Sequence, residues 1–172
     1  LVALAGVVCV GVAVSAGQAD RRVVDGAAQR DIVAVRSLLQ QGADVNAPHG
    51  DGMSALHWAA EHGEAELADM LIYAGATVEA VTRIGAYTPL HVASRGGHAT
   101  VVRLLLEAGA GVGALTAGAD TTALHLAAAS GDADTIRVLL AHGAEANAVE
   151  GSWGQTPLIF AAAGARVEAI RV

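Results

Sequence analysis

The sequence contains no lysine, and its ten basic residues are all arginine. Chemistry that depends on lysine, such as Schiff-base formation or the phosphate contact of a P-loop, is therefore excluded for these 172 residues. Seventeen acidic residues bring the net charge to −7. Nucleic-acid binding requires clustered positive charge that neutralises phosphates, so the expected partner is not a nucleic acid.

Aromatic residues are scarce as well, at 3% of the chain, although hydrophobic residues make up 53% and include many alanines. Small apolar side chains suit helices that pack closely through many short contacts, and they do not suit a large sandwich core built on rings. The only cysteine is Cys9, which excludes a disulfide within the chain. The composition therefore favours a helical fold that needs no covalent cross-link.

The first nineteen residues carry no charge, and residues 1–14 are dense in Leu, Val and Ala. Small residues, among them Ala16 and Ala19, follow before the first charge at Asp20. This pattern is typical of the apolar core and cleavage region of a secretory signal peptide. We therefore expect residues 1–19 to be a bacterial-type signal peptide whose start is missing, and the rest to be periplasmic or extracellular. The alternatives are a buried N-terminal helix and a retained membrane anchor.

Four similar segments recur at one constant interval, and a Gly-Ala pair follows each of the first three segments at a fixed distance. The recurring positions are Ser54, Leu56 and His57, then Thr88, Pro89, Leu90 and His91, then Thr122, Leu124 and His125, and finally Thr156, Pro157 and Leu158. A unit of this size cannot bury its apolar faces alone, so stacked neighbours supply the core. We expect the row of four leucines to lie in that continuous core.

Local physical chemistry predicts a helix–turn–helix in each unit. A Ser or Thr at the start of the segment can accept from free backbone N–H groups, and proline is tolerated in the first helical turn. Gly63 and its equivalents stand where the two helices would be separated. Gly109 and its equivalents stand at the end of the second helix, where glycine adopts a positive φ at little cost.

The sequence resembles the ankyrin-repeat family in its T-P-L-H-x-A motif, in a second helix that ends in Leu-Leu, and in the Gly-Ala pair that follows. The resemblance extends from about Arg21 to Val172. It implies an all-α repeat solenoid in which helix–turn–helix units stack and β-hairpin fingers connect them. It also implies a non-catalytic protein–protein interaction module without a cofactor.

The repeat register predicts the domain organisation. After the signal peptide at 1–19 we expect an N-terminal capping repeat at 20–53, full repeats at 54–87, 88–121 and 122–155, and a partial repeat at 156–172. The first repeat has Arg21 at the motif start and Arg30 at the interhelical glycine position, so it is expected to present a polar outer face. The common period of the family is about 33 residues, and the extra residue here is expected in the finger.

A second hypothesis follows from the last repeat, which ends within its second helix. The chain could be the ankyrin portion of a larger protein whose missing C-terminal part carries a catalytic or membrane function. Recovery of the complete reading frame distinguishes the two hypotheses, because a few more repeats followed by a stop codon would exclude the second one.

His57, His91 and His125 are the strongest candidates for metal binding, but their spacing argues against it. Stacked helices lie about 8–10 Å apart, whereas each metal ligand must lie about 2.1 Å from the ion. We therefore expect each imidazole to hydrogen-bond at the base of a loop and to fix its repeat. The remaining histidines fall on predicted loops and turns and are expected to be solvated: His49, His62, His98 and His142. No nucleophile or phosphate-loop motif is present, so no catalytic residue, metal site or cofactor is predicted.

Candidates for partner binding are the side chains that project from a frame of small residues. In ankyrin-like proteins the partner contacts the fingers and the concave face of the first helices. Register places the following residues there: Met53, Glu61, His62, Arg83, Ile84, Tyr87, Arg95, Ser130, Trp153 and Gln155. Tyr, Trp, Met and Arg are enriched at interface hot spots. We expect another protein as the partner, and a membrane only if the N-terminal segment is retained; the alternative is that each residue merely packs over a neighbouring finger.

Overall fold

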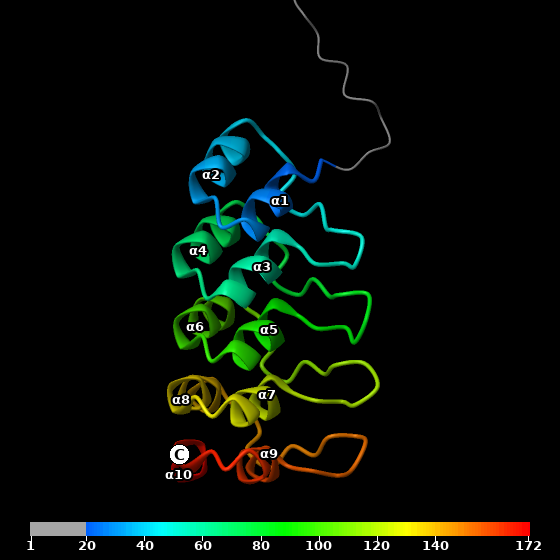
Figure 1. The fold of residues 1–172 in the computed structure, drawn as a ribbon, viewed down its shortest axis with the longest axis vertical. Helices are drawn as coiled ribbons and strands as arrows, with labels where there is room; N and C mark the ends of the chain where they lie inside the picture. Colours follow the sequence, from blue (N-terminus) through cyan, green and yellow to red (C-terminus); the bar gives the residue numbers. More distant parts are fainter. Residues whose placement is uncertain (1–19) are drawn as a thin grey trace, which may run out of the picture.

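The computed structural model describes residues 20–172, and in this part of the chain it shows ten α-helices stacked in pairs (Figure 1). The helices are α1 (Arg22–Ala28), α2 (Ile32–Gln40), α3 (Ala55–His62), α4 (Ala65–Tyr73), α5 (Pro89–Gly96), α6 (Ala99–Glu107), α7 (Ala123–Ser130), α8 (Ala133–Ala141), α9 (Pro157–Ala163) and α10 (Val167–Arg171). The predicted all-α repeat solenoid is confirmed. The predicted signal peptide, residues 1–19, lies outside the described residues.

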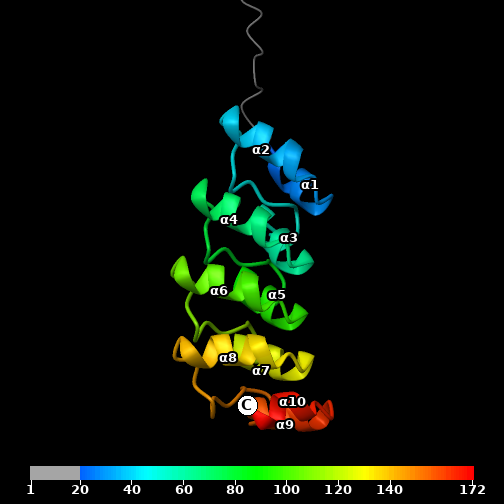
Figure 2. The same cartoon turned by 90° about the vertical axis from the view of Figure 1, so that its left-hand side faces the viewer.

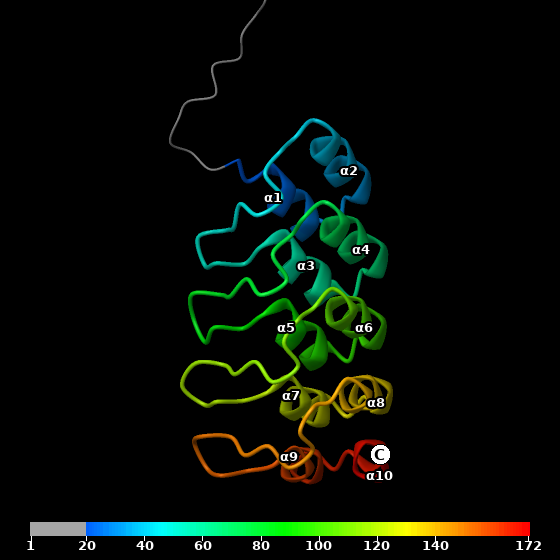
Figure 3. The same cartoon turned by 180° about the vertical axis from the view of Figure 1, so that it is seen from behind.

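The helices form two layers, with the connecting fingers on one side. Odd-numbered helices lie between the fingers and the even-numbered helices (Figures 1 and 3). Within the first layer α3 packs against α1 and α5, and α7 packs against α5 and α9. The view in Figure 2 shows the even-numbered helices following one another along the stack. Each repeat therefore contacts only its neighbours, as expected for a solenoid.

The first helices of three repeats begin with a reciprocal cap made by a hydroxyl and an imidazole. The Ser54 hydroxyl accepts from the backbone N–H of His57, and His57 Nδ1 accepts from the backbone N–H of Ser54 at 3.2 Å. The pairs Thr88–His91 and Thr122–His125 do the same. This arrangement satisfies N–H groups that a helix start leaves free. In α9 the histidine position holds isoleucine, and the Thr156 side chain makes no cap bond.

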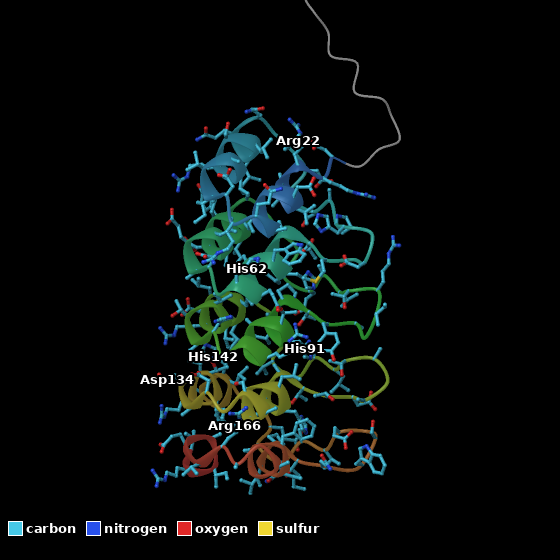
Figure 4. All side chains as sticks on the ribbon, viewed as in Figure 1. Arg22, His62, His91, Asp134, His142 and Arg166 are labelled. Carbon is cyan, nitrogen blue, oxygen red and sulfur yellow. The ribbon has the colours of Figure 1, made fainter. Side chains whose placement is uncertain are left out.

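The same three histidines join the first helix of each repeat to the finger at the end of that repeat. His57 Nε2 donates to the Tyr87 carbonyl at 2.9 Å, and His125 Nε2 donates to the Gln155 carbonyl at 3.1 Å. His91 Nε2 donates to the Ala114 carbonyl at 3.0 Å, where α5 meets the next finger (Figure 4). All three imidazoles are fully buried. The predicted role of these histidines, to fix the repeat at the base of a loop, is confirmed.

The core runs along the stack between the two helical layers. Leu56, Leu90 and Leu124 are buried in it, together with the paired leucines of the second helices such as Leu105. The prediction that Leu158 belongs to the same row is wrong, because its side chain is 57% exposed. In the described stack the next helix pair covers each of the first three leucines, and no helix pair covers α9.

The fingers differ from the expected β-hairpins, since no β-strand occurs within residues 20–172. We define the fingers as residues 44–53, 77–87, 111–121 and 145–155. Neighbouring fingers are joined by one main-chain hydrogen bond each, all of 2.8 Å: Arg83 N to Asp51 O, Ala117 N to Gly85 O, and Gly151 N to Ala119 O. A single bond per pair aligns the fingers but is too little pairing to make a sheet. The fingers are therefore turns held in register.

Candidate functional site

Four of the ten predicted partner-binding residues meet around one depression in the surface. Met53, Ile84, Tyr87 and Arg95 line it, together with Val92 of α5. The depression has a volume of about 260 Å³ and lies where the first two fingers meet α5. Ile84 is 85% exposed, so it reaches solvent at the finger tip. We call this depression the Tyr87 cavity.

Arg95 is held over the Tyr87 cavity from two sides. Its guanidinium carbon lies 5.8 Å from the centre of the Tyr87 ring, which is a cation–π geometry. Its Nη2 donates to Glu61 Oε2 at 2.7 Å. A half-exposed ion pair of this kind adds little to stability, but together with the ring it fixes where the guanidinium lies. The edge of the cavity is therefore ordered before any partner arrives.

A second group of polar and aromatic side chains lies toward the N-terminal end, around Trp58. The ring of His62 stacks on Trp58 with the ring centres 5.7 Å apart. Trp58 Nε1 donates to His49 Nδ1 at 3.3 Å, and His49 Nε2 donates to Asp25 Oδ1 at 2.8 Å. The expectation that His49 and His62 are solvated is wrong, because both are half-buried and have partners. Contacts between α1, α3 and the first finger create this group.

His98 and His142 behave differently from each other. His98 is half-buried, and its Nε2 donates to the Glu61 carbonyl at 3.2 Å, so the expectation of a solvated ring is wrong there as well. His142 is exposed, and its Nδ1 lies 2.8 Å from the Val138 carbonyl of its own helix. Only His142 keeps the solvated position that its predicted turn implied.

The last finger is organised around Glu150, which the sequence analysis did not single out. Its carboxylate accepts from the backbone N–H groups of Ser152 and Trp153, both at 2.6 Å, and of Gln155 at 3.1 Å. Burial by itself would raise the pKa of Glu150, but these backbone donors outweigh it and lower the pKa below its ordinary value. The finger thereby fixes the backbone at Trp153, whose side chain is 81% exposed.

A sequence signal for Glu150 exists in hindsight. The equivalent positions of the two preceding fingers are Thr82 and Thr116, and their hydroxyls accept from the N–H groups of Tyr87 and Thr121, each at 3.0 Å. Every one of these fingers therefore places an acceptor at the same position. Glu150 extends the pattern from one N–H group to three.

The other predicted residues do not join the Tyr87 cavity. The backbone N–H of Arg83 donates to the Asp51 carbonyl of the first finger, and the Arg83 side chain is exposed. The Ser130 hydroxyl donates to the Ala127 carbonyl of its own helix at 2.8 Å. Trp153 and Gln155 belong to the fourth finger. The predicted set is thus divided into residues at or near the first two fingers, two residues of the fourth finger, and Ser130 at the end of α7.

The described residues were also compared with the requirements of a metal site and of a membrane-spanning helix. Within residues 20–172 no three His, Cys, Asp or Glu side chains come close enough together to hold a metal ion. None of the helices described is both long and apolar enough to cross a membrane.

Capped helix pairs that repeat at a regular interval, stack into two layers and carry fingers on one side define a helical repeat solenoid. A model of ankyrin repeats in three copies matches residues 25–116, and a model of ankyrin repeats in many copies matches residues 124–172. The chain belongs to the ankyrin-repeat family. Such repeats are in general protein–protein interaction modules and are typically non-catalytic. No curated protein matches the chain.

Proposed function

We propose that this protein is a non-catalytic scaffold that binds another protein through its fingers and the concave face of its first helices. The observation that carries the proposal is the Tyr87 cavity. There an exposed Ile84 stands beside Tyr87 and Arg95, and the last two are held by ring contact and an ion pair. Apolar, aromatic and arginine side chains grouped around a depression are the usual centre of a protein interface.

Preorganisation is the proposed mechanism of binding. The buried imidazole of His57 ties the Tyr87 carbonyl to the helix behind it, and Asp51 O ties the first finger to Arg83 N. The side chains of the cavity are therefore presented on a backbone that is already fixed. Association then loses less conformational entropy than it would with mobile loops.

Three observations support a function without catalysis, cofactor, metal or nucleic acid. The imidazoles of His57, His91 and His125 are buried and have both ring nitrogens engaged in structural bonds. No acidic or histidine cluster suited to a metal occurs in the described residues. The net charge of −7 disfavours contact with phosphates.

We also propose that the protein is exported, on the basis of the uncharged, apolar residues 1–19. Fusion of this segment to a reporter enzyme that is active only outside the cytoplasm tests the proposal. Reporter activity is expected for the natural segment and is expected to be lost when Val7→Asp and Val10→Asp interrupt the apolar run. An inactive natural fusion would contradict export.

Affinity capture from a native envelope and periplasmic extract tests the scaffold function. The baits are the protein, the site variant Ile84→Ser/Arg95→Ala, and the matched control Val33→Ser/Arg103→Ala. The control residues are exposed on the second helices, away from the fingers. We expect one protein to be captured by the parent and the control and to be lost with the site variant. Equal capture by all three baits, or by none, would contradict the proposal.

A further inference from the structure

A row of exposed aliphatic side chains runs along the fingers and has no part in the core. Val81, Leu115 and Val149 occupy the same place in three successive fingers and are 53%, 54% and 60% exposed. A single exposed aliphatic side chain is ordinary on a protein surface. Three at equivalent positions recur with the repeat, and two of them, Leu115 and Val149, line one depression. Contiguous apolar surface marks interaction sites.

The last two members of the row line a depression between the third and fourth fingers, which project side by side next to α7 and α9 (Figures 1 and 3). Its volume is about 380 Å³, and its walls include Val112, Leu115, Glu145, Asn147 and Val149. We call it the Leu115 groove. None of the residues that line it lines the Tyr87 cavity, so the two are separate surfaces.

Charge identifies what the Leu115 groove would accept. The four fingers hold six acidic residues against one arginine, which accounts for five of the seven net negative charges. Six ion pairs between arginine and a carboxylate occur among residues 20–172, and none of them involves a finger carboxylate. The helices neutralise much of their own charge, whereas the fingers do not. Electrostatic complementarity therefore favours an occupant that carries positive charge as well as apolar side chains.

One of these carboxylates lies in the groove wall, and a second lies beside it. Glu145 is exposed and forms part of its wall. Glu79, from the finger before, accepts from the backbone N–H of Gly111, the residue that precedes Val112 of the wall. Negative charge thus lies on the wall and beside it.

The spacing of the row indicates the conformation of the occupant. Helices of neighbouring repeats pack about 8–10 Å apart, so equivalent aliphatic side chains follow at a similar interval. A polyproline-type segment rises about 3.1 Å per residue and presents every third residue on the same side, at about 9.3 Å. In a β-strand, by contrast, residues i and i+3 point to opposite faces. An extended segment of the polyproline type therefore matches the row.

We propose that the Leu115 groove binds a basic, extended segment of the partner protein, with an aliphatic side chain at every third position and lysine or arginine between. The inference rests on the proposed scaffold function and names a chemistry for its partner. Aliphatic side chains of the segment pack beside Val81, Leu115 and Val149, and its cations lie near Glu79 and Glu145. The interaction weakens with salt, because the carboxylates are exposed and screened.

The probe for this proposal is a fluorescent peptide, acetyl-(Leu-Pro-Lys)₅-amide, titrated with the protein at low and high salt. Proline prevents a helix and favours the extended form. We expect saturable binding, and we expect (Ser-Pro-Lys)₅ and (Leu-Pro-Glu)₅ to bind at least about tenfold more weakly, a difference of about 1.4 kcal/mol. A shuffled peptide of the same composition with adjacent leucines is expected to bind as weakly as the serine peptide.

Two protein variants locate the binding, and each has a matched control. Leu115→Ser/Val149→Ser and Glu79→Gln/Glu145→Gln are each expected to weaken binding at least about fivefold, roughly 1 kcal/mol. The controls Val33→Ser/Tyr73→Ser and Asp69→Asn/Glu107→Gln remove two large exposed side chains and two exposed carboxylates, respectively, from the second helices. They are expected to bind like the parent, and circular dichroism melts verify that all variants fold.

The proposal is overturned if the serine or shuffled peptide binds as tightly as the leucine peptide, if the controls lose as much affinity as the groove variants, or if no binding is seen up to millimolar peptide. Failure here is distinct from failure of the scaffold function. If a partner is still captured through the Tyr87 cavity but no peptide binds, only the proposed peptide binding by the Leu115 groove is contradicted. If the peptide binds but no partner is captured, the proposed scaffold function is contradicted instead.

Discussion

His57 Nε2 donates a hydrogen bond of 2.9 Å to the carbonyl of Tyr87, the last finger residue of the same repeat. The same ring accepts the backbone N–H of Ser54 through Nδ1 at 3.2 Å, so the neutral tautomer with hydrogen on Nε2 is required. One buried imidazole therefore caps its own helix and fixes the backbone beside the Tyr87 cavity. The stability of the stack and the order of the proposed binding surface thus depend on the same bonds.

Removal of one such imidazole should cost more than removal of an exposed one. His91→Ala deletes the cap contact and the bond to Ala114 and leaves buried groups unpaired, so the free energy of unfolding is expected to fall by about 2–4 kcal/mol. His142→Ala, at an exposed position, is expected to change it by less than about 0.5 kcal/mol. Urea titrations at pH 7.5 measure both. Similar losses in the two variants would contradict the structural role of the His91 imidazole.

Stability should decline as the pH is lowered through the ordinary histidine range. Burial lowers the pKa of His57 and of His91, so the unfolded chain takes up protons below its pKa of about 6.5 while the folded chain does not. The stabilisation is therefore complete above that pH and is lost as the pH falls below it. Urea midpoints between pH 8 and pH 5 measure the decline. The variant His57→Asn/His91→Asn is expected to be less stable than the parent at every pH, but its urea midpoint should fall less between pH 8 and pH 5. An equal fall in the variant and the parent would show that these two histidines do not cause the decline.

A buried hydroxyl group in α5 should lower the stability of the protein. Ser94 is fully buried, and its Oγ has no hydrogen-bond partner among the described residues, while the neighbouring repeats hold Ala60 and Ala128 at the same place. Ser94→Ala is expected to raise the free energy of unfolding by about 1 kcal/mol, because an unsatisfied polar group no longer has to be desolvated. Thermal melts compare it with Ser37→Ala at an exposed position. A destabilised Ser94→Ala would mean that the hydroxyl does have a partner in solution.

Replacement of Ala86 by glycine should stabilise the protein. The position just before the last finger residue always has a positive φ: +88° at Gly52, +49° at Ala86, +49° at Asp120 and +66° at Gly154. A side chain is disfavoured in this left-handed region, so Ala86→Gly is expected to stabilise the protein by about 0.5–1 kcal/mol. Ala162→Gly in helix α9 is expected to cost about 1 kcal/mol. If both substitutions destabilise in urea titrations, Ala86 is not strained.

Glu150 should control the order of the last finger. Glu150→Gln retains one good acceptor for three backbone donors, so faster amide hydrogen exchange is expected at Ser152, Trp153 and Gln155. Because these donors lower the pKa of Glu150, the parent is expected to keep its protection as the pH drops and to lose it only below the ordinary range of a glutamate. Exchange measured by nuclear magnetic resonance between pH 7 and pH 3 tests this. Glu107→Gln on α6 is the control, and unchanged exchange in Glu150→Gln would contradict the role.

Much of the fold follows from the sequence by itself, because its signals are local. Ser54 and His57 stand three residues apart, the separation at which a cap and the first helical turn meet. Arg30 and Gly63 mark the turn between helices, and both have a positive φ there, +61° and +68°. The regular interval at which the motif recurs then implies that similar units stack. These features need only the residues of one turn and the knowledge that the unit recurs.

The tertiary structure decided what depends on contacts between repeats. Leu158 has the motif of a core residue but is exposed, since burial requires a neighbouring helix pair. His49 joins Asp25 and Trp58 across 24 and 9 residues. The Tyr87 cavity and the Leu115 groove exist because side chains of successive fingers come together in space. Pairing of this kind is set by how the units rotate and approach one another, and no local pattern in the sequence encodes that geometry.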